Sequence, residues 1–206
     1  MKFSISLPTG FEGVMYPIPF VEPGDFVRMA QLCETLGYDS VWGNDHITSQ
    51  HYVRELFPDK APNFYEVLTV LSFCAAATTR IRVGTALTVL PMRDPFWLAK
   101  QAATIDQLSN GRLVLALGVG AYREEFAAWA PRLAPKARRG EMMRLAARFF
   151  SFYPFQRKAR ANITKFFCCV AAGSSPFPLA IRVAAMRTAR FGVVVQFENV
   201  CAIQLR

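Results

Sequence analysis

The sequence is poor in the residues that build disulfide-stapled or metal-dependent proteins. It has only two histidines and five cysteines among 206 residues, and no two cysteines stand in C-x-x-C spacing. We therefore expect neither a disulfide framework nor a zinc site, and no metal site of any kind. Two of the cysteines, Cys33 and Cys74, fall on the apolar faces of expected helices, where a thiol serves as a small hydrophobic side chain.

Long apolar runs are also missing. No stretch approaches the ~18 residues that a membrane helix needs. The N-terminal MKFSISLP lacks the longer apolar core and the cleavage site of a signal peptide. With 52% hydrophobic and 19% charged residues, the composition is typical of a globular protein. We expect a cytoplasmic protein with no membrane partner.

Acidic residues are nearly missing from one part of the chain. Residues 1–143 carry 14 basic and 14 acidic side chains, whereas residues 144–206 carry 10 basic and 1 acidic. The whole net charge of +9 therefore lies in this second part, which also holds nine of the 18 phenylalanines. We divide the chain into a first domain, 1–143, and an atypical basic tail, 144–206. Arg and Phe can stack on bases, but they follow no known motif here, so nucleic acid is not a favoured partner.

The first domain alternates two hydrophobic periods. Strand patterns cover residues 3–7, 39–43, 80–90 and 112–120; helix patterns cover 23–37, 63–78 and 94–109, and a last helix begins over 122–130. Asn63 and Asp94 are placed as N-caps, and the polar segment 44–62 as a loop. Four successive β-α units predict a parallel sheet with right-handed crossovers. Two architectures fit: an open doubly wound sheet, or the first half of a (β/α)8 barrel.

In both architectures ligands bind at the carboxyl ends of the strands. Asp45 and His46 follow the second strand, so this pair can bind a polar ring edge, or His46 can act as a base near neutral pH. The plainer alternative is a polar loop with an exposed histidine. His51, inside the same loop, has no clear partner and is expected to be solvated. Arg93, after the third strand, can meet an anion or support the cap of the next helix.

A glycine-rich turn follows the fourth strand. Gly118 and Gly120 form a G-x-G that opens a helix, a context in which backbone N–H groups hold anions. Position 123 is Arg instead of the third glycine, so the signal for a bound anion is weak and the alternative is a tight β-α turn. Glu124 and Glu125 are expected to complement the dipole of the helix that follows.

Three motifs in order carry a resemblance to a known family. VWGNDHI (41–47), IRVGTALTVLPMRDP (81–95) and QLSNGRLVLALGVGAYREEF (107–126) together resemble the luciferase-like flavin-dependent oxidoreductases, over about residues 1–143. These include bacterial luciferase, alkanesulfonate monooxygenase and deazaflavin (F-420) dependent enzymes. The resemblance implies an α/β fold, here a partial (β/α)8 TIM barrel of four β-α units. It implies an oxidoreductase that uses FMN or coenzyme F-420 to transfer hydride or activate oxygen on a small organic substrate.

The resemblance also implies roles for particular residues. Asp45 and His46 match the catalytic acidic-His position near the ring system. Thr88 matches the segment that lies along that ring, and the turn Gly118, Gly120, Ala121 and Tyr122 matches a cofactor-lining segment. The DHI form is closer to the deazaflavin branch, which favours hydride transfer.

The tail departs from the family pattern. Its one acid and its many Arg and Phe residues show no β-α rhythm. Our hypothesis is that residues 144–206 are an out-of-frame or otherwise replaced segment, and that the chain is truncated relative to the family. Reading the other two frames of the gene beyond codon 143 tests this. A catalytically inactive remnant is then the alternative function. Its first and fourth strands would be unpaired edges that invite a homo-oligomer.

Overall fold

The computed structural model describes residues 2–13, 16–131, 141, 166–169, 195–197 and 200–202. The strands are β1 (Ser4–Leu7), β2 (Ser40–Gly43), β3 (Arg82–Thr85), β4 (Thr88–Val89), β5 (Leu113–Gly118), β6 (Phe166–Cys169), β7 (Val195–Phe197) and β8 (Val200–Ala202). The helices are α1 (Pro23–Thr35), α2 (His51–Leu56), α3 (Val67–Ala76), α4 (Pro95–Leu108) and α5 (Arg123–Trp129), with a 3₁₀ turn at Leu90–Met92. The boundary predicted between residues 143 and 144 and most of the tail lie outside the described residues.

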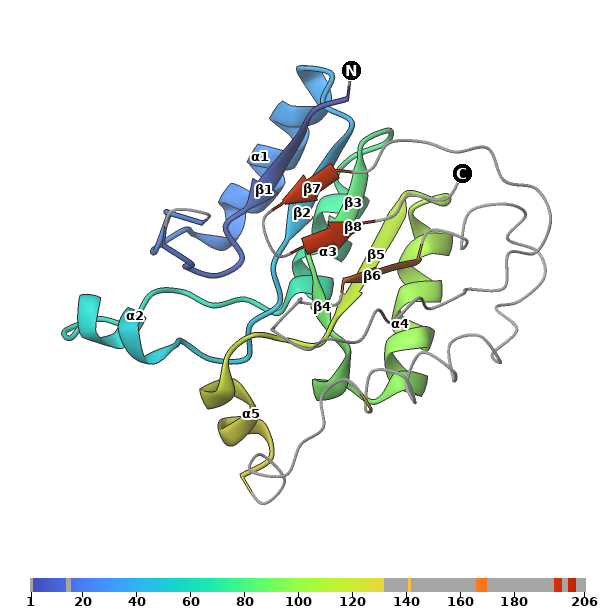
Figure 1. The fold of residues 1–206 in the computed structure, drawn as a ribbon. Helices are drawn as coiled ribbons and strands as arrows, with labels where there is room; N and C mark the ends of the chain where they lie inside the picture. Colours follow the sequence, from blue (N-terminus) through green and yellow to red (C-terminus); the bar gives the residue numbers. More distant parts are fainter. Residues whose placement is uncertain are drawn as a thin grey trace.

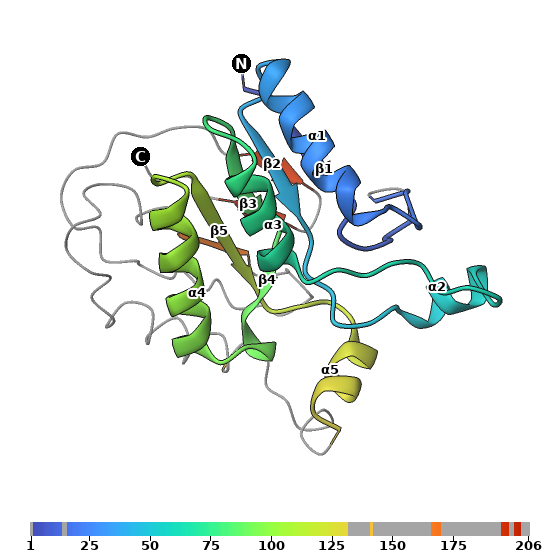
Figure 2. The same ribbon diagram turned by 180° about the vertical axis from the view of Figure 1, so that it is seen from behind.

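The strand order decides between the two architectures. Strands β1, β2, β3 and β5 pair in parallel in chain order, with Ile5 opposite Val41 and Val41 opposite Val83. Helices α1, α3 and α4 all cover the same face of the sheet (Figures 1 and 2). A doubly wound sheet reverses its strand order and carries helices on both faces. The four β-α units therefore form a partial (β/α)8 barrel, as the sequence predicted.

The third strand is broken, which the sequence analysis did not foresee. The pattern over 80–90 predicted one strand, but the chain bends at the cis peptide between Ala86 and Leu87. The two pieces, β3 and β4, pair with successive parts of β5. Because of the bend, the backbone of β4 lies at the carboxyl end of the sheet, where the family resemblance places the cofactor.

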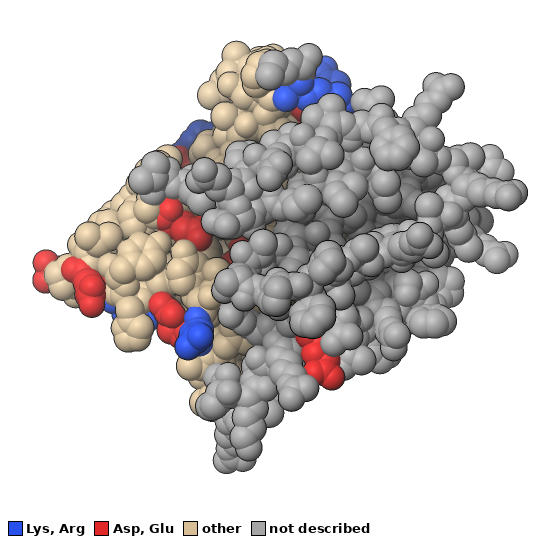
Figure 3. Space-filling model, viewed as in Figure 1, with Lys and Arg blue, Asp and Glu red and all other residues tan. Residues whose placement is uncertain are grey.

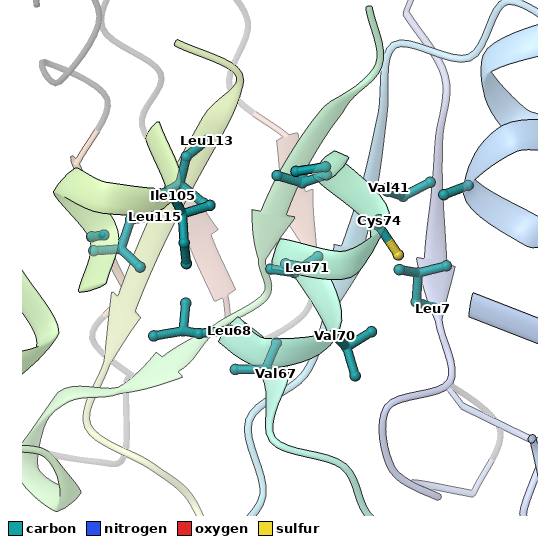
Figure 4. Close-up of a cluster of buried hydrophobic side chains, with 14 of the residues drawn as sticks. Leu7, Val41, Val67, Leu68, Val70, Leu71, Cys74, Ile105, Leu113 and Leu115 are labelled. Atoms are coloured by element: carbon teal, nitrogen blue, oxygen red, sulfur yellow. The ribbon is translucent and has the colours of Figure 1, made fainter. Parts of the chain in front are cut away.

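Helix α3 lies at the centre of the core. Leu71, Val67 and Cys74 are fully buried on it and lie over the strands in Figure 4, where Cys74 points toward Leu7 of β1 and Val41 of β2. Each such side chain contributes about 1.5–3 kcal/mol by leaving water.

The expectation that Cys33 and Cys74 are core residues is confirmed, because both thiols are buried. A free cysteine in such a place acts as a small apolar side chain, and burial raises the pKa of Cys74 to about 12.

The helix starts were predicted with mixed success. Asp94 caps α4 as expected, accepting a hydrogen bond from the backbone N–H of Trp97 at 2.9 Å. The Asn63 cap is wrong, because α3 begins later and Glu66 caps it, accepting from the N–H of Thr69 at 2.7 Å. Asn63 donates instead to the carbonyl of Val21. The segment expected to be a loop, 44–62, contains α2 and projects as an arm beside the sheet (Figure 1).

The tail contributes strands to the fold. β6 pairs in parallel with β5 along Leu115–Gly118, on the side away from β4. The prediction that the fourth strand is an unpaired edge is therefore wrong. Within the described ranges β1 pairs only with β2, so an oligomer through that edge stays a prediction. β7 and β8 form an antiparallel pair on the face opposite α1, α3 and α4 (Figures 1 and 2). No helix in the described part of the chain is long and apolar enough to cross a bilayer.

Candidate functional site

His46 lies between two carboxylates at the carboxyl ends of the strands. Its Nδ1 is 2.9 Å from Oε1 of Glu125, and its Nε2 is 3.5 Å from Oε2 of Glu12. The Glu125 side chain is 1% exposed and also accepts from the backbone N–H of Ile47. Glu12 follows β1, His46 follows β2 and Glu125 opens α5. The cluster therefore joins two loops and the first turn of a helix, which are far apart in the sequence.

The surroundings keep His46 protonated. Burial lowers the pKa of His46, but hydrogen bonds and charges from Glu12 and Glu125 outweigh burial and raise it to about 9. Burial raises the pKa of Glu12, but His46 and a hydrogen bond from Tyr122 bring it below its usual value. At neutral pH the group is an imidazolium between carboxylates. His46 can then donate a proton, and it is not the free base that the sequence position suggested.

Tyr122 completes the cluster. Its hydroxyl donates to Oε1 of Glu12 at 2.9 Å, and its ring centroid lies 5.7 Å from that of His46. Burial, followed by the charge of Glu12, raises the pKa of the Tyr122 hydroxyl. The rings of Tyr52, from α2, and Phe64 flank the same cluster. Two residues that the sequence analysis selected separately, His46 and Tyr122, are thus brought together.

Asp45 does not face His46. Its Oδ2 accepts from the backbone N–H of Val89 at 2.9 Å and from Nε of Arg93 at 3.0 Å. Its Oδ1 accepts from Nη2 of Arg93 at 2.6 Å. The anions that Arg93 meets are therefore the carboxylates of Asp45 and Glu66. Adjacent residues on the chain have separate surroundings, and the catalytic role predicted for Asp45 stays a prediction.

The glycines of the G-x-G turn have packing reasons of their own. A Cβ on Gly118 would lie 2.3 Å from Cδ1 of Leu87. Gly120 has φ +74°, and a Cβ there would lie 2.7 Å from Cγ1 of Val89. These contacts fit the alternative of a tight β-α turn. The cofactor-lining role expected for this turn and for the exposed Ala121 stays a prediction.

Three buried polar atoms at this rim have no hydrogen-bond partner in the part of the chain that the structure describes. They are Nδ2 of Asn44, Oε1 of Gln50 and Oγ1 of Thr88. Nε2 of Gln50 lies 2.9 Å from Nδ1 of His46. Because a protonated His46 donates from Nδ1, the amide oxygen suits that position, and the amide nitrogen is then the atom left unpaired. Buried polar atoms are normally paired, and an unpaired one costs about 1–3 kcal/mol. Their gathering at one rim points to a polar ligand.

Sequence reasoning missed several members of the cluster. Glu12 and Gln50 lie in loops with no periodic pattern, and only the fold brings them to His46. Glu125 was assigned to the helix dipole, although the E-E-F of the third motif could have indicated it. His51 is exposed, as expected, and its backbone N–H donates to Glu124. Among the described residues, no group of three or more Asp, Glu, His or Cys is arranged to hold a metal ion.

Comparison with known proteins settles the family. The family model of luciferase-like monooxygenases matches residues 1–162, which is most of the chain. The chain belongs to the luciferase-like monooxygenase family. The motifs that carried the resemblance all lie within the matched residues.

Curated relatives in this family use two kinds of cofactor by name. The F420-dependent glucose-6-phosphate dehydrogenase of Amycolatopsis mediterranei is 32% identical over 106 residues, 51% of this chain and 30% of the relative. The oxygenase component of a flavin-dependent trigonelline monooxygenase from Acinetobacter baylyi is 29% identical over 107 residues, 52% of this chain and 27% of the relative. The chain thus matches less than a third of either relative's length.

Solved structures of luciferase-like enzymes share the fold. The oxygenating constituent of 3,6-diketocamphane monooxygenase from Pseudomonas putida, in complex with FMN, aligns with a TM-score of 0.58 and 20% identity. This alignment covers 73% of this chain and 38% of that one. An F420-dependent secondary alcohol dehydrogenase aligns with a TM-score of 0.56 and 23% identity, covering 73% of this chain and 42% of that one.

Proposed function

We propose that this chain forms the strand-end rim of an oxidoreductase that binds FMN or the deazaflavin F-420 and acts on a small organic substrate. The proposal rests on one observation above the others: three buried polar atoms at the carboxyl ends of the strands have no hydrogen-bond partner among the described residues, and one of them belongs to Gln50, which contacts His46. The family supports the two cofactor classes, because named relatives depend on one or the other.

The residues present suit a flavin-like ring system. Its edge carries carbonyl oxygens and ring nitrogens, which need both donors and acceptors. Asn44 offers an amide donor, Gln50 an amide group, and Thr88 a hydroxyl that both donates and accepts. Pairing these atoms with a ligand would remove a cost of about 1–3 kcal/mol for each. The bound cofactor supplies the redox chemistry, and the protein supplies orientation and exclusion of water.

The His46 cluster supplies a proton donor. With a pKa of about 9, His46 holds a proton at neutral pH that Nε2 or Nδ1 can donate to a neighbouring group. Glu12 and Glu125 hold the ring from both sides and stabilise its charge. Such a donor suits reactions in which a substrate oxygen gains a proton, including hydride transfer to a carbonyl carbon.

Ligand titration tests the proposal. Purified protein is titrated with FMN and with F-420, and the fluorescence of the ligand is followed. We expect binding in the micromolar range, weakened about tenfold in Thr88→Val, because a lost hydrogen bond of about 1.4 kcal/mol is a factor of ten. Thr104→Val is the matched control, because that hydroxyl is exposed and donates only within α4. A folded protein that binds neither ligand would contradict the proposal.

The second candidate is a family member without activity. The observation that favours it is the extent of the matches, since 38% and 42% of the two solved neighbours align with this chain. Loops after the later strands of a barrel also contribute to its active site. Binding of FMN or F-420 without turnover of any alcohol, aldehyde or ketone would favour this candidate.

A further inference from the structure

We propose that Arg93 is a positioning residue, which locks the Asp45 carboxylate and through it holds the β4 backbone that presents Thr88. The part of this inference that concerns ligand affinity rests on the proposed function. The part that concerns the backbone does not, because it follows from contacts within the chain.

Arg93 forms a two-point ion pair with Asp45. Arg93 binds its carboxylate through both Nε and Nη2, at 3.0 and 2.6 Å. This two-point geometry fixes the plane of a carboxylate, which a single ammonium cannot do. The same carboxylate accepts the backbone N–H of Val89 at 2.9 Å. Arg93 therefore sets the direction from which Asp45 holds the β4 backbone.

Arg93 is itself held in place by a second carboxylate. Its Nη2 also reaches Oε1 of Glu66 at 2.8 Å. Glu66 is tied in turn to the start of α3, because its other oxygen accepts from the N–H and the hydroxyl of Thr69. Helix α3 is the most buried helix of the core. The guanidinium thus connects the rim to the rigid centre of the fold.

The position of Val89 affects both Thr88 and the G-x-G turn. Thr88 is the neighbour of Val89 and is fully buried, and its hydroxyl oxygen has no hydrogen-bond partner among the described residues. The Val89 side chain fills the space beside Gly120, so its placement also determines that of the G-x-G turn. A shift of the Val89 backbone would therefore move both Thr88 and the G-x-G turn. This accounts for the direction of Asp45, whose carboxylate faces the Val89 N–H and Arg93 instead of His46.

The chain offers a matched control at the other end of the sheet. Arg82 forms an ion pair with Asp39, and the Arg82 and Arg93 side chains are each 19% exposed. Arg82 starts β3, at its amino end, and no residue selected for the site contacts it. Arg82→Met and Arg93→Met each remove an ion pair with an aspartate. Only Arg93→Met also removes the contacts that orient Asp45 toward the β4 backbone.

Two readouts test the proposal on the whole chain. The first is amide hydrogen exchange at Val89 without ligand; the second is the dissociation constant for FMN and for F-420. In Arg93→Met we expect Val89 to exchange at least about tenfold faster and ligand affinity to fall about tenfold. Arg93→Lys should give a smaller change of the same sign, because lysine keeps the charge and loses the fork. Arg82→Met should leave both values at those of the unmodified chain.

The outcomes separate the two proposals. Equal exchange at Val89 in Arg93→Met and Arg82→Met would overturn the positioning role. If Arg93→Met does not fold, the same comparison is made with Arg93→Lys and Arg82→Lys, with the same criterion. If the unmodified chain binds neither FMN nor F-420, the proposed function fails, and the exchange at Val89 still decides the role of Arg93.

Discussion

Polar side chains at the two ends of the parallel sheet differ in how completely they are hydrogen-bonded within the chain. At the amino end, the Arg112 guanidinium donates to the carbonyl oxygens of Ala75, Thr78, Ile81 and Ser109, at 2.6–3.0 Å. The Glu34 carboxylate there accepts from the backbone N–H groups of residues 79–81. These charged groups are all satisfied inside the chain, and they join helices to strands.

At the carboxyl end, charged and polar groups are satisfied only in part. The His46 cluster and the Arg93 pairs are complete, but three neighbouring polar atoms lack partners among the described residues. Acidic side chains also show on this part of the surface, over the segment that carries α2 (Figure 3). Hydrogen bonds that close within the chain join its helices to its strands at the amino end, whereas the open polar atoms at the carboxyl end are the basis for the ligand site proposed above.

The largest effect is expected at the amino end. Arg112→Ala removes the charged donor of several carbonyl oxygens, and we expect the free energy of unfolding to fall by about 4 kcal/mol. Urea unfolding measures this. Arg28→Ala is the control, because that exposed arginine pairs only with Asp25 and should cost less than about 0.5 kcal/mol. Similar losses in both variants would contradict the comparison at this end.

The His46 cluster should make stability depend on pH. The pKa of His46 is about 9 when folded and 6.5 when exposed, so the folded state holds the extra proton between these values. Its contribution is fully present below pH 6.5 and is lost as pH rises through 9, a fall of about 3 kcal/mol at about 1.4 kcal/mol per pH unit. Urea unfolding from pH 6 to 9.5 measures it. His46→Gln should remove this part of the slope; an unchanged slope would show that other groups cause it.

The two ends also differ at glycines with positive φ. Gly120→Ala at the rim meets both a left-handed backbone and the Val89 side chain, and should cost about 2 kcal/mol. Gly37→Ala, before β2 at the amino end, has φ +80° but open space, and should cost about 1 kcal/mol. Thermal or urea unfolding of both variants gives the difference. Equal costs would mean that Val89 yields and that the turn is not tightly packed.

The smallest effect is a change of sign between two buried threonines. Thr88→Val removes an unpaired hydroxyl and should raise the free energy of unfolding by about 1 kcal/mol. Thr85→Val removes a hydroxyl that donates to the carbonyl and accepts from the N–H of Ala116, and should lower it by about 1.5 kcal/mol. If both variants lose stability, the hydroxyl of Thr88 has a partner in solution and the rim is not open there.

Much of the fold could be predicted because the hydrophobic period is strong. The four β-α units, the Asp94 cap and the buried cysteines follow from patterns of 3–16 residues. The exceptions have local causes. The short helix α2 has no apolar stripe, Glu66 outcompetes Asn63 as a cap because Thr69 is in reach, and the third strand bends where its chain meets the rim.

The candidate site likewise has one part that could be predicted from the sequence and one part that could not. Position after a strand was enough to select His46, since parallel strands end at one edge, whereas Thr88 and Tyr122 were selected through the family resemblance. Position was not enough to say which carboxylate faces which cation. Asp45 and His46 are neighbours in sequence, yet one pairs with Arg93 and the other with Glu12 and Glu125.

The sequence alone determined the order of strands and helices and the edge at which function is placed, because these depend on local periodicity and chain direction. The tertiary structure alone excluded the open doubly wound sheet that the periodicity had left as an alternative, and showed that a β6 strand from the basic tail pairs with β5. It also decided that His46 is a protonated residue between carboxylates. That last property depends on groups up to 79 residues apart, whose distance no local pattern encodes.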